Sequence, residues 1–208
     1  MPQINIGVLV SGNGTNLQSL IDNINAGNIN AKIKVVISDR INAYGLIRAE
    51  GCGIDTVYVG RKNFKDEKEF NRAIIYELNK RNVQLVVLAG YLKILSGEFI
   101  NEYKNKIINI HPSLIPSFCG RGYYGEKVHK AILDYGAKVT GATVHFVNEE
   151  ADAGPIILQR PVMVDEADTV DSLKNKVLKT EHKLLPEAVR LFCEGRITVD
   201  GRKVTIKE

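Results

Sequence analysis

Two polar side chains end a short apolar segment in the middle of the chain. The run 107–112, Ile-Ile-Asn-Ile-His-Pro, starts with β-branched residues and ends in an imidazole and a proline. In an extended strand Asn109 and His111 point to the same side, and Pro112 favours that extended backbone. An amide beside an imidazole suits a reaction that builds negative charge on a carbonyl oxygen. The alternative is a histidine that simply ends a strand and bonds to nearby backbone.

A second polar segment, 148–155, reads Asn-Glu-Glu-Ala-Asp-Ala-Gly-Pro. Such a run of charge is often an acidic surface loop. Asp152 differs from Glu149 and Glu150 because small residues and Pro155 hold its backbone close to the next extended run. A carboxylate fixed beside His111 would hold the imidazole ring and stabilise its charged form. The separation of the two residues in the sequence leaves open whether they meet.

A glycine-rich turn, Ser-Gly-Asn-Gly-Thr-Asn at 11–16, joins the first apolar run to a helical pattern. Glycines allow a tight turn, and a new helix presents free N–H groups that favour a phosphate. Thr15 and Asn16 are candidates to cap this helix or to bind phosphate oxygens. The dinucleotide fingerprint fails because its third glycine would fall at Leu17, and the P-loop lysine is absent. Asp39 could still imitate a ribose-binding acid, and a plain helix start is the alternative.

The other reactive side chains offer weaker candidates. We interpret His145, in an alternating extended run, as structural or as lining the site, and His129 and His182 as surface or packing residues. The spacing of the histidines and cysteines predicts neither a metal site nor a disulfide framework, and no covalent nucleophile is evident. If acyl transfer occurs, we therefore expect the nucleophile to come from the substrate. The three cysteines, expected to be reduced thiols, are Cys52, Cys119 and Cys193.

Short apolar runs and helical patterns alternate along the first half of the chain. Apolar runs without alternation predict buried strands, and spacings of three and four predict helices. This order indicates a Rossmann-like, mostly parallel sheet with helices on both faces over roughly the first 112 residues. We expect strands at 4–10, 33–38, 54–59, 84–89 and 106–110, and helices at 16–26, 43–49 and 66–79.

The second half changes character. Residues 139–147 alternate, 155–164 are extended, and both indicate antiparallel strands. A long helix is expected from Val170 to Cys193, interrupted near Pro186. The pair Asp200-Gly201 predicts a hairpin with a two-residue loop. The chain has no linker-like composition, which predicts a single domain over 1–208.

Composition excludes several classes of protein. The 208 residues are 44% hydrophobic and 25% charged, which is typical of a soluble globular protein. The longest apolar run, from Leu85 to Leu92, is far shorter than a membrane helix needs. The start of the sequence carries no secretory signal pattern, so we expect a cytoplasmic protein that binds no membrane. A net charge of +4 and 7% aromatic residues give little reason to expect a nucleic-acid partner.

Four segments together resemble the phosphoribosylglycinamide formyltransferase family of folate-dependent enzymes in purine synthesis. The resemblance covers nearly the whole chain. The Asn-Ile-His-Pro-Ser-Leu-x-Pro block with Asp-x-Gly-Pro is specific to the formyltransferase superfamily, and the glycine-rich turn indicates the purine branch. The matching segments are 11–16, 88–95, 109–116 and 152–159.

The resemblance implies a mechanism. The amine of 5-phosphoribosylglycinamide (GAR) would attack the formyl carbon of the co-substrate 10-formyltetrahydrofolate. Asn109 and protonated His111 would stabilise the oxyanion. Asp152 would support His111 and help to move the proton from the amine to the folate nitrogen, through water.

The resemblance also implies binding residues, no metal, and a monomer or homodimer. The folate-contacting arginine of some members falls here near Glu67, beside Lys65 and Lys68. The segment 117–125 is longer than in some relatives. Its glycines suggest a mobile loop by the site at 118–125, and Arg121 could reach an anionic ligand. The residues matched to GAR binding are Gly14, Thr15, Asn16 and Glu181, and those matched to folate binding are Leu92, Lys93, Ile94, Leu95, Asn109, Asn148, Glu149, Glu150 and Ala151.

Other functions remain as alternatives. A transfer RNA formyltransferase shares the Asn-x-His-Pro block but has an added domain, which we do not expect after residue 208. A formyltetrahydrofolate hydrolase would have an extra N-terminal domain, whereas the first strand here is expected at Ile4. A non-catalytic nucleotide-binding module would not need Asn109, His111 and Asp152, and an NAD-linked dehydrogenase is disfavoured by Leu17.

Overall fold

The computed structural model describes residues 2–207. Seven strands follow the order β3-β2-β1-β4-β5-β6-β7 in one sheet, and β8 and β9 form a separate pair. The chain divides into two compact units, and the division between Ile108 and Asn109 falls inside strand β5 (Ile107–His111).

The first unit is built on parallel strands. β1 pairs in parallel with β2 and with β4, and β2 pairs in parallel with β3. All four residues of β4 are buried, as expected of a strand covered on both faces. The strands are β1 (Ile4–Val10), β2 (Ala31–Ser38), β3 (Thr56–Tyr58) and β4 (Leu85–Leu88).

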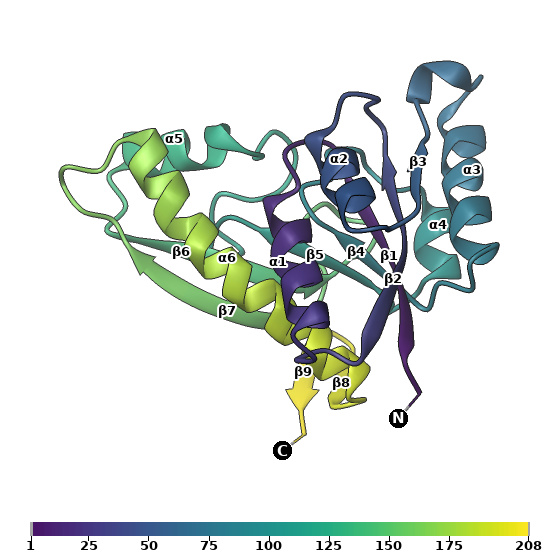
Figure 1. Ribbon diagram of the computed structural model, residues 1–208. Coiled ribbons are helices and arrows are strands. Elements are labelled where there is room, and N and C mark those ends of the chain that lie inside the picture. The colour runs from purple at the N-terminus through teal and green to yellow at the C-terminus, as the bar shows by residue number, and fades with distance from the viewer. Residues whose placement is uncertain (1, 208) are drawn as a thin grey trace. The chain divides into compact units, whose positions relative to one another are not determined.

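Helices form two neighbouring pairs in this unit, α1 with α2 and α3 with α4 (Figure 1). In α3 the Asp66 side chain caps the first turn by accepting from the Glu69 N–H, and an apolar stripe that includes Phe70 and Ile74 is buried. The helices are α1 (Thr15–Asn25), α2 (Tyr44–Gly51), α3 (Glu67–Asn79) and the short α4 (Gly97–Glu102), with a 3-10 turn η1 (Arg61–Asn63).

The second unit holds an antiparallel pair, β6 (Val139–Phe146) and β7 (Ile156–Met163). The long helix α6 (Val170–Cys193) packs on both strands and on α5 (Glu126–Tyr135) (Figure 1). The β6–β7 register shifts between Val144 and His145. Such a bulge changes the direction of nearby side chains.

Two sequence-based expectations about this unit are wrong in detail. Helix α6 runs unbroken through Pro186, which is buried with Leu184 and Leu185. A proline removes one helical hydrogen bond, and the apolar contacts of this buried face offset that loss. In the C-terminal hairpin Asp200 pairs with Lys203, so the loop is Gly201–Arg202, one residue later than expected. The hairpin strands are β8 (Ile197–Asp200) and β9 (Lys203–Ile206).

The observed architecture confirms the predicted α/β class: a Rossmann-like, mostly parallel sheet with helices around it, and antiparallel strands in the C-terminal half. None of the helices within residues 2–207 is long and apolar enough to cross a membrane.

Candidate active site

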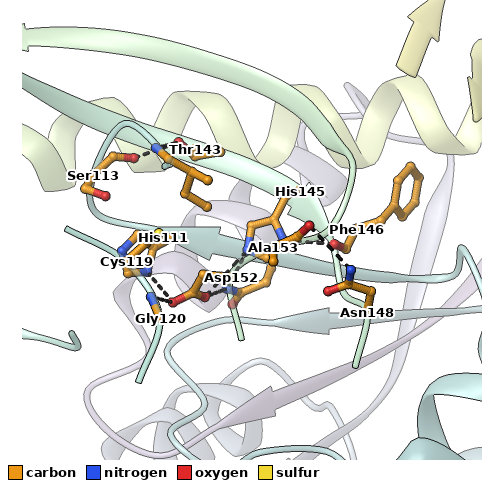
Figure 2. A network of polar contacts seen from close by, with 12 residues as sticks. His111, Ser113, Cys119, Gly120, Thr143, His145, Phe146, Asn148, Asp152 and Ala153 are labelled. Atoms are coloured by element: carbon orange, nitrogen blue, oxygen red, sulfur yellow. Dashed lines mark hydrogen bonds and ion pairs between the residues drawn. The ribbon is translucent and has the colours of Figure 1, made fainter. Parts of the chain in front are cut away.

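Asn109 and His111 converge on Asp152 in the second unit. The Asn109 Nδ2 lies 3.5 Å from Asp152 Oδ1, and the His111 Nδ1 lies 3.5 Å from Asp152 Oδ2. Figure 2 shows the Asp152 carboxylate between the His111 ring and the His145 ring. The strand places Asn109 and His111 two residues apart on one side, as the sequence predicts, and His111 is buried.

The His111 ring is held by a backbone carbonyl. Its Nε2 lies 3.0 Å from the Phe118 carbonyl oxygen, which only accepts, so Nε2 carries a proton. Phe118 has a φ of 50°, and its ring packs edge-on against Tyr123 and Tyr135. The Ser113 hydroxyl supports the same turn, donating to the Ser117 carbonyl at 2.6 Å. The imidazole is therefore fixed with Nδ1 facing the carboxylate.

The loop that carries Asp152 is held just as firmly. The Gly120 N–H donates to Asp152 Oδ2 at 2.9 Å. Asp152 has a φ of 53°, a backbone conformation that aspartate tolerates better than most residues. A Cβ atom on Gly154 would overlap the Phe146 carbonyl oxygen, and the Phe146 N–H donates to the Pro155 carbonyl at 2.8 Å. The glycine and proline of the Asp-x-Gly-Pro segment thus seat the loop against β6.

His145 is the one member of this cluster whose contacts sequence reasoning left unassigned. Its Nε2 lies 3.1 Å from Asn109 Nδ2 and 3.8 Å from Asp152 Oδ1, and its Nδ1 lies 2.8 Å from the Phe146 carbonyl oxygen. Burial is the main cause that lowers the pKa of His145. The alternation of β6 offered a signal, because it puts His145 on the same face as Thr143, whose hydroxyl donates to the Ser113 carbonyl at 2.6 Å.

This cluster can polarise a carbonyl oxygen and move a proton. The Asn109 amide and the His111 Nδ1 are neighbouring groups that face one carboxylate. In a buried setting each electrostatic interaction is stronger than in water. An amide donor and an imidazole beside a carboxylate are what an addition to a carbonyl carbon requires: stabilisation of the oxyanion and a place for the proton of the nucleophile.

The glycine-rich turn lies in the first unit. Helix α1 begins at Thr15, with Gly14 as its N-cap at a φ of 71° and no side-chain cap bond. The expectation that Thr15 or Asn16 caps the helix is therefore wrong, because both residues already lie in its first turn. A Cβ on Gly14 would lie 2.6 Å from the Gly45 Cα. Arg48 Nε donates to the Asn13 carbonyl at 2.8 Å, which fixes the turn against α2.

Ser11 ties this turn to the segment after β4. Its hydroxyl donates to Asp39 Oδ1 at 2.6 Å and accepts from the Leu92 N–H at 2.9 Å. Asp39 therefore has a structural partner. In the segment predicted to bind folate, the side chains of Leu92 and Ile94 are exposed and that of Leu95 is buried.

The remaining sequence-predicted binding residues differ in their surroundings: Lys93, Glu149, Glu150 and Ala151 are exposed, and the others are partnered or buried. In the second unit Asn148 Nδ2 donates to the Ala153 carbonyl at 3.4 Å, and Glu181 is buried. In the first unit Glu67 forms an ion pair with Arg61 at 2.6 Å. Glu67, near which the sequence resemblance placed a folate-contacting arginine, thus pairs with Arg61.

The other histidines and the thiols lie outside this cluster or at its edge. His129 is a buried packing residue, and burial, followed by the charge of Lys174, lowers its pKa to about 4. The Cys119 thiol donates to the Pro116 carbonyl at 3.2 Å, and burial, with the charge of Asp152, raises its pKa. Within residues 2–207 no group of three or more His, Cys, Asp and Glu side chains is placed to hold a metal ion.

Comparison with known proteins identifies the family. The model of the family described as formyl transferase matches residues 4–189. This chain belongs to the formyl transferase family. It is 42% identical over 192 residues to a protein of Haemophilus influenzae named phosphoribosylglycinamide formyltransferase. That match covers 92% of this chain and 88% of the Haemophilus protein. It is also 42% identical to the human trifunctional purine biosynthetic protein adenosine-3, over 98% of this chain.

The chain spans only 20% of the length of that human protein, so its match is to one part of a larger relative. Among solved structures, it resembles glycinamide ribonucleotide transformylase 1 from Symbiobacterium toebii. The TM-score between the two structures is 0.95 and the sequence identity is 44%. The superposition covers 99% of this chain and 95% of the other chain. Membership of the formyl transferase family thus rests on both sequence and fold.

Proposed function

We propose that this protein transfers a formyl group from 10-formyltetrahydrofolate to the amine of GAR, giving formyl-GAR in de novo purine synthesis. The observation that carries the proposal is the convergence of Asn109 and His111 on Asp152. It occurs in a chain that matches 88% of the length of a Haemophilus influenzae protein named phosphoribosylglycinamide formyltransferase.

In this mechanism the amine nitrogen of GAR attacks the formyl carbon and forms a new C–N bond. The carbonyl π electrons move to oxygen, and the Asn109 amide and protonated His111 stabilise that oxyanion. Asp152 accepts the amine proton, through water, and returns it to the folate nitrogen as the old C–N bond breaks. The products are formyl-GAR and tetrahydrofolate, and no covalent intermediate with the protein is needed.

Binding of GAR is assigned to the glycine-rich turn and to Glu181. Gly14, Thr15 and Asn16 open helix α1, where backbone N–H groups and the helix dipole favour a phosphate. The absence of an acidic residue in the first turn of α1 supports this assignment, because it leaves the dipole uncompensated. Glu181 would hold the ribose hydroxyls.

Binding of 10-formyltetrahydrofolate is assigned to two segments and one amide. The exposed apolar side chains of Leu92 and Ile94 suit a flat aromatic ring system. We also propose that the protein works in the cytoplasm on these two small molecules, as a monomer or homodimer and without a metal. The assigned residues are 92–95, Asn109 and 148–151.

The test is an assay of formyl transfer from 10-formyltetrahydrofolate to GAR, with a control that omits GAR. We expect formyl-GAR and tetrahydrofolate in equal amounts, and little release of formate in the control. Thr15→Ala and Asn16→Ala should weaken GAR binding more than they lower kcat. Equal formate release with and without GAR would instead favour a hydrolase, and binding of both ligands without turnover would favour a non-catalytic module.

A further inference from the structure

His145 lies at the centre of the polar cluster but has no part in the mechanism above. It is among the most buried polar residues in the described part of the chain, at 1% exposure. It is too enclosed to meet a substrate directly, yet it contacts the amide that is expected to bind the oxyanion. We propose that His145 is a positioning residue for formyl transfer that fixes which end of the Asn109 amide faces the Asp152 carboxylate, an inference that rests on the proposed function.

The tautomer of His145 follows from its first contact. The Phe146 carbonyl oxygen, 2.8 Å from Nδ1, has no proton to give, so Nδ1 carries the hydrogen. The neutral ring then has a bare Nε2. Burial lowers the pKa of His145, which keeps the ring neutral and Nε2 an acceptor. The groups that face this ring are the Phe146 carbonyl, Asn109, Asp152 and His111.

The orientation of Asn109 follows from the tautomer. A bare Nε2 at 3.1 Å accepts a hydrogen bond only from the NH2 end of the Asn109 side chain. The second hydrogen of that NH2 group points toward Asp152 Oδ1, 3.5 Å away. Asn109 therefore presents its NH2 end, and not its carbonyl oxygen, to the Asp152 carboxylate. A flipped amide would place its oxygen against that carboxylate and be repelled by it.

The backbone holds His145 in this role. In the β6–β7 pair Val144 pairs with Leu158 and His145 with Ile156, so the extra residue, Ile157, lies on β7 and strand β6 continues through His145. Gly154 contacts the Phe146 carbonyl so closely that a Cβ there would overlap the oxygen that holds His145. The Asp-x-Gly-Pro segment thus places the Asp152 carboxylate and also supports the carbonyl that sets the tautomer.

Two substitutions of His145 distinguish the contribution of Nε2 from that of Nδ1. The amide of Gln can reach the position of Nε2, so His145→Gln keeps an acceptor for Asn109. The shorter Asn reaches only the position of Nδ1, so His145→Asn keeps the bond to the Phe146 carbonyl and loses the acceptor. The control is Thr140→Val on the same strand, a buried hydroxyl with no hydrogen-bond partner within residues 2–207.

The experiment measures formyl transfer to GAR for the wild type and the three variants, with thermal unfolding as a check of folding. We expect His145→Asn to lower kcat by roughly 10²-fold, as misplacement of a reacting group does, with KM nearly unchanged. His145→Gln should recover at least about a tenth of wild-type kcat, which is within one decade of the full rate. Thr140→Val should match the wild type. Equal kcat for the Asn and Gln variants of folded protein would overturn the positioning role.

A second readout does not depend on turnover. Nitrogen-15 spectra of the His145 ring in the wild type should show a protonated Nδ1 and a bare Nε2, with the Asn109 NH2 hydrogens in slow exchange. A protonated Nε2 in the folded protein would overturn the inference even if formyl transfer is normal. A wild type with these spectra but no transfer would contradict the proposed function and leave the positioning of Asn109 intact.

Discussion

Gly154 lies so close to the Phe146 carbonyl oxygen that a residue with a side chain does not fit at position 154. Two members of the polar cluster depend on this contact: Asp152, two residues before Gly154, and His145, whose Nδ1 donates to that carbonyl. We expect Gly154→Ala to destabilise the protein by about 1–3 kcal/mol, the usual cost of overpacking, and to lower formyl transfer at temperatures where the variant is folded.

Chemical unfolding monitored by circular dichroism measures this cost. Gly51→Ala is the matched control, because no atom lies within 4 Å of a Cβ there and the residue ends a helix. It should be neutral or slightly stabilising. A Gly154→Ala variant as stable as Gly51→Ala would refute the close packing.

Asp152→Asn tests the role of the carboxylate. Asn also tolerates the φ of 53° at this position, so the fold should survive. The variant loses the negative charge that faces His111 and the proton acceptor, and kcat should fall by at least about 10²-fold. Calorimetry should find GAR binding largely unchanged. Asp134→Asn, which breaks an exposed ion pair with Lys130, is the control and should keep full activity; near-normal turnover of Asp152→Asn would rule out its assigned part in proton transfer.

His129 makes the stability sensitive to acid. Burial lowers its pKa from 6.5 to about 4 in the folded protein. The unfolded chain therefore binds this proton at a higher pH than the folded chain, and stability falls as the pH drops from 6.5 to about 4. His129 changes the free energy of unfolding by at most about 1.4 kcal/mol per pH unit. His129→Gln should flatten that part of the curve of unfolding free energy against pH. Parallel curves for variant and wild type would contradict the burial of a neutral imidazole.

Gly14 is the position in the glycine-rich turn that least tolerates a side chain. Its φ is 71°, and a Cβ would lie 2.6 Å from the Gly45 Cα. Gly14→Ala should displace the first turn of α1 and raise the KM for GAR by about tenfold or more, the effect of losing roughly 1.4 kcal/mol of binding. At Gly12 a Cβ meets nothing within 4 Å, so Gly12→Ala should have a smaller effect. Equal KM values for the two variants would argue against a phosphate site at this turn.

Much of the fold was predictable because buried parallel strands appear in the sequence as unbroken apolar runs. Strand β1 has the expected bounds, Ile4–Val10, and α3 begins directly after its Asp66 cap. The short helix α4 was not assigned, because six residues give too little periodicity. The continuity of α6 through Pro186 depends on tertiary packing that local propensity does not contain.

The candidate site was only partly predictable. The alternation of a strand places Asn109 and His111 on one side, but their meeting with Asp152 depends on the path of the chain between them. The contacts that orient the two histidines are with the carbonyls of Phe118 and Phe146. Every residue has a backbone carbonyl, so no residue type marks this role in a sequence.

The central claim is that the amine of GAR, and not water, receives the formyl group. The most direct measurement supplies 10-formyltetrahydrofolate labelled with carbon-13 in the formyl group, together with GAR, and follows the label by NMR. The account predicts that the label appears in the amide of formyl-GAR at a rate equal to the formation of tetrahydrofolate, and that Asp152→Asn abolishes both. Label that appears in formate at the same rate with or without GAR would contradict it.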